Sequence, residues 1–176
     1  MLSANLKEPF LVADGCVTKT EAGYAMHYIF GTSWLSDPQS EVPERVYKIG
    51  VATSVDLISW RRTSEAIISN VLGREECQAY PAVFDRDGQH HMIFAFRSHV
   101  DFRQNPRRAY RLGHATSDDL VNWSRDDGLG GVDFPREDWD QGMRCYPSVF
   151  QMDGRLYLLY NGNDFGKRGF GLAQLV

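Results

Sequence analysis

Hydrophobic and polar residues alternate in short runs along this chain, and turn residues separate the runs. The clearest unit has runs at Tyr80–Phe84 and His91–Arg97, joined by an Asp-Arg-Asp-Gly turn, and a third run at Tyr110–Ser117. Such alternation over about four to eight residues is typical of a half-buried β-strand. No stretch keeps a 3.6-residue apolar period over three turns. The pattern therefore predicts an all-β protein with few helices.

Two pairs of segments repeat within the sequence. Tyr47–Trp60 (YKIGVATSVDLISW) matches Tyr110–Trp123 (YRLGHATSDDLVNW), which begins 63 residues later. Tyr80–Phe84 (YPAVF) matches Tyr146–Phe150 (YPSVF), which begins 66 residues later. Two independent matches at nearly one period indicate a repeated structural unit.

Each period predicts four short strands, which is the pattern of a β-propeller blade. We expect one partial propeller domain over residues 1–176, with the last of three blades lacking its fourth strand. Because a propeller needs four to eight blades, further blades or a second copy of the chain must complete the ring. The blades are expected at about residues 8–65, 75–128 and 140–176. Their expected strands are 10–17, 24–30, 47–54 and 60–62 in the first, 80–84, 91–97, 110–117 and one starting at 123 in the second, and 146–150, 155–161 and 170–175 in the third.

The Ser-x-Asp-Leu-x-x-Trp element that ends each long match joins a third strand to a fourth. Asp56 and Asp119 in this element resemble functional acids, but an aspartate there can accept hydrogen bonds from turn amides. We expect a structural role for both. The third strands also repeat a small-x-small pattern, which should let a neighbouring backbone approach; the pairs are Gly50 and Ala52, Gly113 and Ala115, and Gly171 and Ala173.

Composition argues against several kinds of partner. The formal net charge is −4 and the pI is about 5.7, so neither nucleic acid nor a membrane surface is expected as a partner. Cys16, Cys77 and Cys145 show no metal-type spacing, and reduced thiols favour a cytoplasmic location. His90 and His91 are neighbours that point to opposite faces of a strand, so no metal and no cofactor are expected.

Four segments resemble a known group of proteins: EPFLVADGCV, EECQAYPAVF, YRLGHATSDDLVNW and the stretch from Trp139 to Ala173. They are similar to the C-terminal part of bacterial proteins related to glycoside hydrolase family 43, in the arabinanase, levansucrase and invertase superfamily of five-bladed propellers. The resemblance covers roughly Glu8 to Leu175. It implies a carbohydrate partner and carboxylates meeting at the propeller axis. It also implies two earlier blades, one of which normally carries the catalytic base.

The resemblance suggests two catalytic carboxylates. Alignment of the first strands on Pro81 and Pro147 places Asp14 opposite Tyr80 and Tyr146, so Asp14 resembles an axial aspartate that tunes the transition state; the alternative is an aspartate that caps a turn. Glu76 resembles the general acid of invertase-like members; the alternative is a packing carboxylate, and Glu75 competes for the role.

Other residues could bind a sugar. Arg97 ends an otherwise apolar strand, and Trp139 could stack on a sugar while Arg144 grips its hydroxyls. The alternative for Asp140 and Arg144 is an ion pair between loop residues. Asn161 and Asn163 could donate to hydroxyls, although Asn-Gly is also a turn signal.

The leading hypothesis is a glycosidase that cleaves a furanoside or similar linkage by carboxylate acid/base catalysis. The alternatives are a sugar-binding or assembly module without activity, and a fragment of a longer protein. A homo-oligomer, preferably a dimer, is expected to close the ring.

Overall fold

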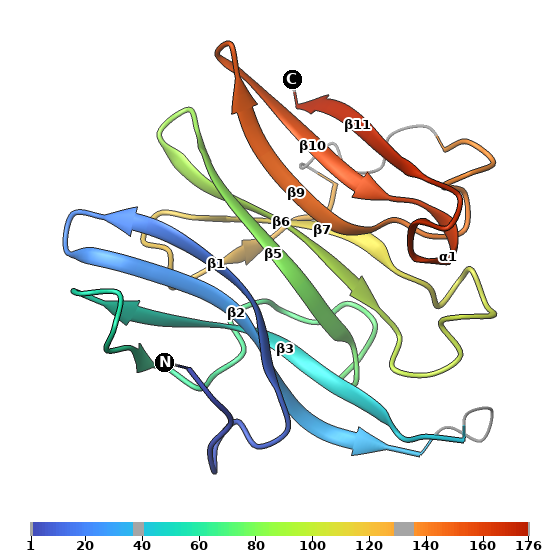
Figure 1. The fold of residues 1–176 in the computed structure, drawn as a ribbon, viewed down its shortest axis with the longest axis horizontal. Coiled ribbons are helices and arrows are strands. Elements are labelled where there is room, and N and C mark those ends of the chain that lie inside the picture. Colours follow the sequence, from blue (N-terminus) through green and yellow to red (C-terminus); the bar gives the residue numbers. More distant parts are fainter. Residues whose placement is uncertain (1, 37–40, 129–135, 176) are drawn as a thin grey trace.

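The computed structural model describes residues 2–36, 41–128 and 136–175. Within them the chain is all-β, with three antiparallel sheets in a row and one four-residue helix (Figure 1). The first sheet comprises β1 (Val12–Thr20), β2 (Gly23–Leu35), β3 (Glu44–Ser54) and β4 (Arg61–Arg62), the second β5 (Cys77–Arg86), β6 (Gln89–Arg97), β7 (Arg111–Ser117) and β8 (Ser124–Arg125), and the third β9 (Cys145–Met152), β10 (Arg155–Asn161) and β11 (Phe170–Leu175), with α1 (Asn163–Gly166) between its last two strands.

Each sheet is a meander in which consecutive strands pair with each other. The first two sheets have four strands and the third has three, so the predicted partial propeller with an incomplete last blade is confirmed. We call the sheets blades 1, 2 and 3. The strands of blade 1 are longer than expected, because β2 and β3 stay paired as far as Leu35 and Glu44.

The blades pack through apolar side chains that alternate along their middle strands. Ile49 of blade 1 and Met92 and Phe94 of blade 2 are fully buried and belong to one cluster. Burial of these side chains stabilises the stack by roughly 1.5–3 kcal/mol for each residue. A hydrophobic core between the two sheets therefore holds blades 1 and 2 together.

The third-strand glycines lie closest to aromatic rings. A Cβ atom on Gly113 would lie 2.5 Å from the ring of Phe94, and one on Gly50 would lie 2.8 Å from the ring of Phe30. Each glycine therefore makes room for an aromatic ring of the adjacent strand in its own blade. At Gly50 the backbone carbonyl oxygen of Glu65 would also lie 3.4 Å from an added Cβ atom, so a neighbouring backbone approaches there as predicted.

The Ser-x-Asp-Leu-x-x-Trp turns have the expected structural role. In blade 1, Asp56 Oδ1 accepts hydrogen bonds from the amides of Ile58 and Ser59, at 2.8 and 2.7 Å. The equivalent carboxylate of Asp119 accepts the amides of Val121 and Asn122. These bonds lower the pKa of both carboxyl groups.

No helix in the described part of the chain is long and apolar enough to cross a membrane.

Candidate functional site

The first strand of each blade contains a bulge with a residue in the left-handed region. The register of β1 shifts between Ala13 and Cys16, that of β5 shifts between Ala79 and Ala82, and the pairing of β9 with β10 shifts in the same way. The left-handed residues are Asp14, Tyr80 and Tyr146, with φ values of 55°, 53° and 55°. The alignment of Asp14 with the two tyrosines is thus present in the backbone. Because left-handed backbone is costly for residues other than glycine, a conformation repeated three times marks a positioned feature of the fold.

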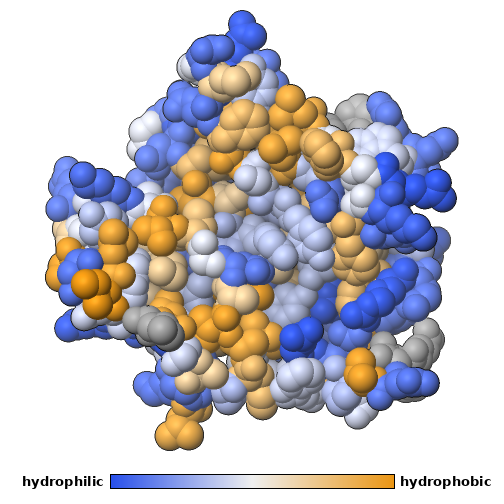
Figure 2. Space-filling view, in the orientation of Figure 1, coloured by the Kyte–Doolittle hydropathy of each residue, from blue (hydrophilic) through white to orange (hydrophobic). Residues whose placement is uncertain are grey.

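The bulges bring these side chains together at the meeting of the three first strands. The amide of Tyr80 lies 3.4 Å from Asp14 Oδ2, and the rings of Tyr80 and Tyr146 are 4.4 Å apart. Phe165, which lies within α1, stacks on Tyr146 with the ring centroids 6.3 Å apart. We call Asp14, Tyr80, Tyr146 and Phe165 the central surface. Residues of intermediate hydropathy occupy the middle of the space-filling view, with hydrophobic residues around them (Figure 2).

Asp14 is only partly buried, and its environment favours the protonated form. Burial raises the pKa of its carboxyl group, while the hydrogen bond from the Tyr80 amide opposes the rise. A carboxyl group with a raised pKa can hold or donate a proton at a milder pH than a solvated aspartate can. Asp14 therefore has the exposure and the electrostatics of a group that can act on a ligand.

Glu76 lies in a different environment. Its carboxylate is fully buried; Oε2 accepts the amides of Val71 and Leu72, both at 2.9 Å. Its Oε1 accepts Gln78 Nε2 at 3.0 Å and forms an ion pair with Arg125 at 2.7 Å. These four donors saturate the carboxylate. Its contacts are those of the packing carboxylate that the sequence left as the alternative, and its catalytic role stays a prediction. Glu75 pairs instead with His99.

A buried carboxylate with an arginine partner occurs in every blade. Glu8 pairs with Arg62, Glu76 with Arg125, and Asp140 with Arg144. Tyrosine hydroxyls at equivalent positions also donate to two of these carboxylates: Tyr28 to Glu8 at 2.6 Å and Tyr160 to Asp140 at 3.0 Å. The three carboxylates thus form a structural series that anchors the segment before each first strand.

Blade 3 forms this anchor without a fourth strand. Arg62 and Arg125 belong to β4 and β8, whereas Arg144 lies four residues after Asp140 in the same segment, with Nε 2.8 Å from Oδ2. Arg144 therefore balances the buried charge of Asp140 where blades 1 and 2 use a fourth-strand arginine. The structure has the ion pair that the sequence offered as the alternative to sugar binding.

The other predicted sugar-binding residues also have internal partners. Trp139 stacks on Tyr160 at 5.5 Å, and Arg97 is buried against the rings of Phe102, Tyr47 and Tyr110. Asn161 donates to the Phe165 carbonyl, and Asn163 Oδ1 accepts the amides of Gly142 and Met143. Sugar binding by these residues stays a prediction, and Arg97, Asp140 and Arg144 lie below the surface.

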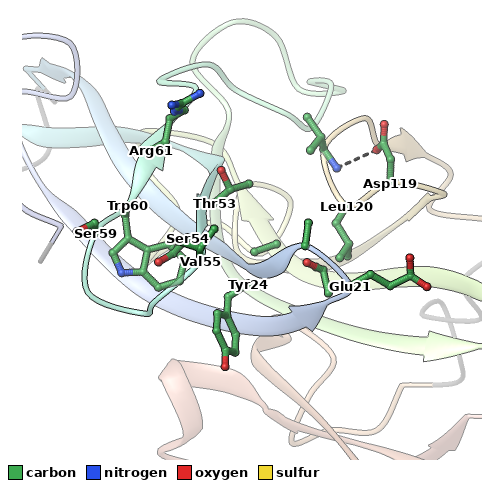
Figure 3. Close-up of a pocket in the computed structure, with 14 residues that line it drawn as sticks. Glu21, Tyr24, Thr53, Ser54, Val55, Ser59, Trp60, Arg61, Asp119 and Leu120 are labelled. Carbon is green, nitrogen blue, oxygen red and sulfur yellow. Dashed lines mark hydrogen bonds between the residues drawn. The ribbon is translucent and has the colours of Figure 1, made fainter.

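A pocket of about 830 Å³ lies at the turn end of blades 1 and 2, away from the bulges (Figure 3). It is lined by Trp60 and Arg61 of blade 1 and by Asp119 and Leu120 of blade 2. Because turn amides already occupy the Asp119 carboxylate, this pocket offers less chemistry than the central surface.

The sequence did not single out Tyr80, Tyr146 or Phe165 as site residues. The repeated Tyr-Pro pair marked two of them, but a tyrosine before a proline reads equally well as a packed strand residue. Across the described residues, His, Cys, Asp and Glu side chains nowhere gather in threes that could hold a metal ion.

Known proteins resemble this chain in sequence and in fold. No protein-family model matches the chain. Two Mycobacterium tuberculosis proteins, both described as uncharacterized (MT1551 and Rv1502), are 28% identical over 169 residues. The alignment covers 96% of this chain, which spans about half the length (52%) of these relatives.

Several solved structures with a similar fold are described as glycoside hydrolases. One described as a glycoside hydrolase matches with a TM-score of 0.70 and 20% identity, covering 99% of this chain and 48% of its own. A family 117 glycoside hydrolase from Zobellia galactanivorans matches with a TM-score of 0.68 and 15% identity, over 93% and 50% of the two chains. A thermostable family-43 glycoside hydrolase has a TM-score of 0.64 and 15% identity, over 94% and 55%. The fold of this chain is therefore that of part of a glycoside hydrolase β-propeller.

Proposed function

We propose that this chain is part of a carbohydrate-active β-propeller and that a sugar binds at the central surface, with Asp14 as the carboxylate that faces it. The observation that carries the proposal is the position of Asp14: it occupies the bulge position of its first strand, beside two tyrosines at the same position in their own strands. The fold shared with glycoside hydrolases supports a sugar as the ligand.

The chemistry of the central surface suits a sugar. Tyr80 and Tyr146 present aromatic rings on which the C–H face of a pyranose or furanose can lie, and their hydroxyls can bond to sugar hydroxyls. Asp14 adds a strong acceptor, and because of its raised pKa it can also donate a proton. An aromatic face with one acid at its edge is sufficient for binding.

Hydrolysis of a furanoside or similar linkage is the second candidate function. Glycosidic cleavage requires a protonated acid and a second, ionised carboxylate. The raised pKa of Asp14 favours this candidate, but the central surface as defined contains one carboxylate, and Glu76 would have to leave its four donors to become the second. A binding module without turnover therefore fits the geometry better than a complete glycosidase.

Titration of the chain with arabino- and fructo-oligosaccharides by isothermal calorimetry tests the proposal. We expect Asp14→Asn and Tyr146→Ala each to weaken binding about tenfold, which corresponds to roughly 1.4 kcal/mol. The matched control is Asp153→Asn. Asp153 has a similar left-handed backbone (φ 50°) but lies exposed in the turn between β9 and β10.

Binding that Asp14→Asn and Tyr146→Ala leave unchanged would exclude the central surface as the sugar site. Turnover is tested separately with a panel of nitrophenyl glycosides. Cleavage that survives in Glu76→Gln would remove Glu76 from the mechanism, while cleavage lost in Asp14→Asn alone would raise the second candidate above the first.

A further inference from the structure

One face of blade 3 is exposed although the equivalent faces of blades 1 and 2 are buried. The glycines Gly50, Gly113 and Gly171 lie opposite Tyr28, Phe94 and Tyr160 and so align the three third strands. In this alignment Phe170 and Leu172 correspond to Ile49 and Val51 of blade 1.

The exposure of these aligned positions differs sharply. Ile49 and Val51 are 0% exposed because blade 2 packs over them, and their counterparts in blade 2 are buried as well. Phe170 and Leu172 are 72% and 59% exposed. Tyr157 and Leu159 are on the same side of the neighbouring strand β10. We call Phe170, Leu172, Tyr157 and Leu159 the outer face of blade 3.

The structure itself shows what covers such a face. Leu120, in the Ser117–Trp123 turn of blade 2, packs against Ala25 and Val51 of blade 1 and is only 3% exposed. Its carbonyl also accepts a hydrogen bond from His27 Nε2 at 2.9 Å, and Trp123 meets the His27 ring edge-on at 5.2 Å. A Ser-x-Asp-Leu-x-x-Trp turn thus covers part of the outer face of the preceding blade.

Blade 1 carries the same turn, but its leucine is far more exposed than the leucine of blade 2. The hydrogen bonds of Ser54 and Asp56 repeat those of Ser117 and Asp119, and Leu57 has φ 63° where Leu120 has 64°. Leu57, however, is 49% exposed, and Ile58 beside it is 73% exposed. Blade 1 and blade 3 lie at opposite ends of the row of blades (Figure 1). The two ends therefore carry complementary halves of an interface that the chain already uses internally.

We infer that a second copy of this chain binds here, with its Ser54–Trp60 turn on the outer face of blade 3. The contact is head-to-tail, because the two surfaces that meet are different. Two copies joined at both ends contain six blades, within the four to eight of known propellers.

Sedimentation velocity of the intact chain over a range of concentrations tests this association. We expect the wild-type chain to sediment as a dimer or a larger species. Leu57→Asn, and separately the double substitution Phe170→Ser with Leu172→Ser, should each give a monomer. Asparagine is suited to position 57 because it tolerates the left-handed backbone, and the two residues on β11 are exposed, so both variants should fold.

Mixing the two variants distinguishes a head-to-tail contact from any symmetric one. Each variant keeps the half of the interface that the other has lost, so the mixture should form dimers at the highest concentration and nothing larger. Val71→Lys is the control, since Val71 is exposed and apolar but lies in the connection between β4 and β5, outside both surfaces; it should behave as wild type. A wild-type chain that is monomeric throughout, or a mixture that stays monomeric, overturns the inference.

Discussion

Tyr47 and Tyr110, the first residues of the two long sequence repeats, form a hydrogen bond with each other through their buried hydroxyl groups. Arg97 Nε donates to the Tyr47 hydroxyl at 3.2 Å, and its guanidinium lies against both rings. The pair joins blades 1 and 2, so equivalent residues of the two sequence repeats contact each other in the fold.

Replacing Tyr47 with phenylalanine should lower the free energy of unfolding by about 1 to 2 kcal/mol, because Tyr110 and Arg97 each lose a buried hydrogen-bond partner. Urea unfolding measures the change. Tyr24→Phe is the control, since the Tyr24 hydroxyl makes no hydrogen bond to any described residue, and it should leave stability within about 0.5 kcal/mol of wild type. Equal losses in the two variants would contradict the prediction.

Leu120 and Leu57 provide a second test, because they share a turn and a backbone conformation but differ in burial. Leu120→Ala should lower the free energy of unfolding by about 2 to 4 kcal/mol, because it leaves a cavity between blades 1 and 2. Leu57→Ala should lower the free energy of unfolding of the monomer by less than about 1 kcal/mol. Chemical denaturation of both variants at low protein concentration checks the difference. Similar losses of stability in the two variants would show that the leucine stabilises the turn itself and not the contact between the blades.

Stability should depend on pH through His27. Burial lowers the pKa of His27 to about 4 from its usual 6.5, so the unfolded chain binds this proton first as the pH falls. The contribution of His27 to stability is therefore present above pH 6.5 and is lost as the pH falls from about 6.5 to 4. Between pH 7 and pH 5 the free energy of unfolding should fall by roughly 2 kcal/mol through this group. His27→Gln can keep the bond to the Leu120 carbonyl and should reduce the pH dependence by that amount. A variant that shows the full wild-type difference would rule out His27 as its source.

Glu76 and Asp14 should respond oppositely to neutralisation. Glu76→Ala should lower the free energy of unfolding by about 2 to 4 kcal/mol, because the amides of Val71 and Leu72 lose their acceptor and Arg125 keeps only its second carboxylate partner. Thermal unfolding at pH 7 measures the effect, and a stable, fully folded variant would argue against the structural role of Glu76.

Asp14→Asn should leave the melting temperature at pH 7 unchanged or higher. The folded-state pKa of Asp14 is raised, so its ionised form disfavours folding as the pH rises above the usual value of 3.8, and asparagine removes that charge. The amide oxygen of asparagine can still accept the Tyr80 amide. A clear fall in the melting temperature would show that the carboxylate is itself part of the packing.

The sequence alone determined the blades, because strand alternation and turn chemistry are local properties that recur with the period. The strand ranges predicted from Tyr47–Trp60 and Tyr110–Trp123 correspond to strands of blades 1 and 2. The repeat also placed Asp14 opposite Tyr80 and Tyr146, which the bulges share.

Only the tertiary structure decided which carboxylates are available to a ligand. Glu76 and Asp14 look alike in sequence, each an acid just before or within a first strand. Arg125, 49 residues away, is one of four donors to the buried carboxylate of Glu76. Asp14 accepts a hydrogen bond from the amide of Tyr80, 66 residues away, and keeps part of its surface open. Burial and pairing depend on residues that folding brings together, and neither spacing nor composition encodes that proximity directly.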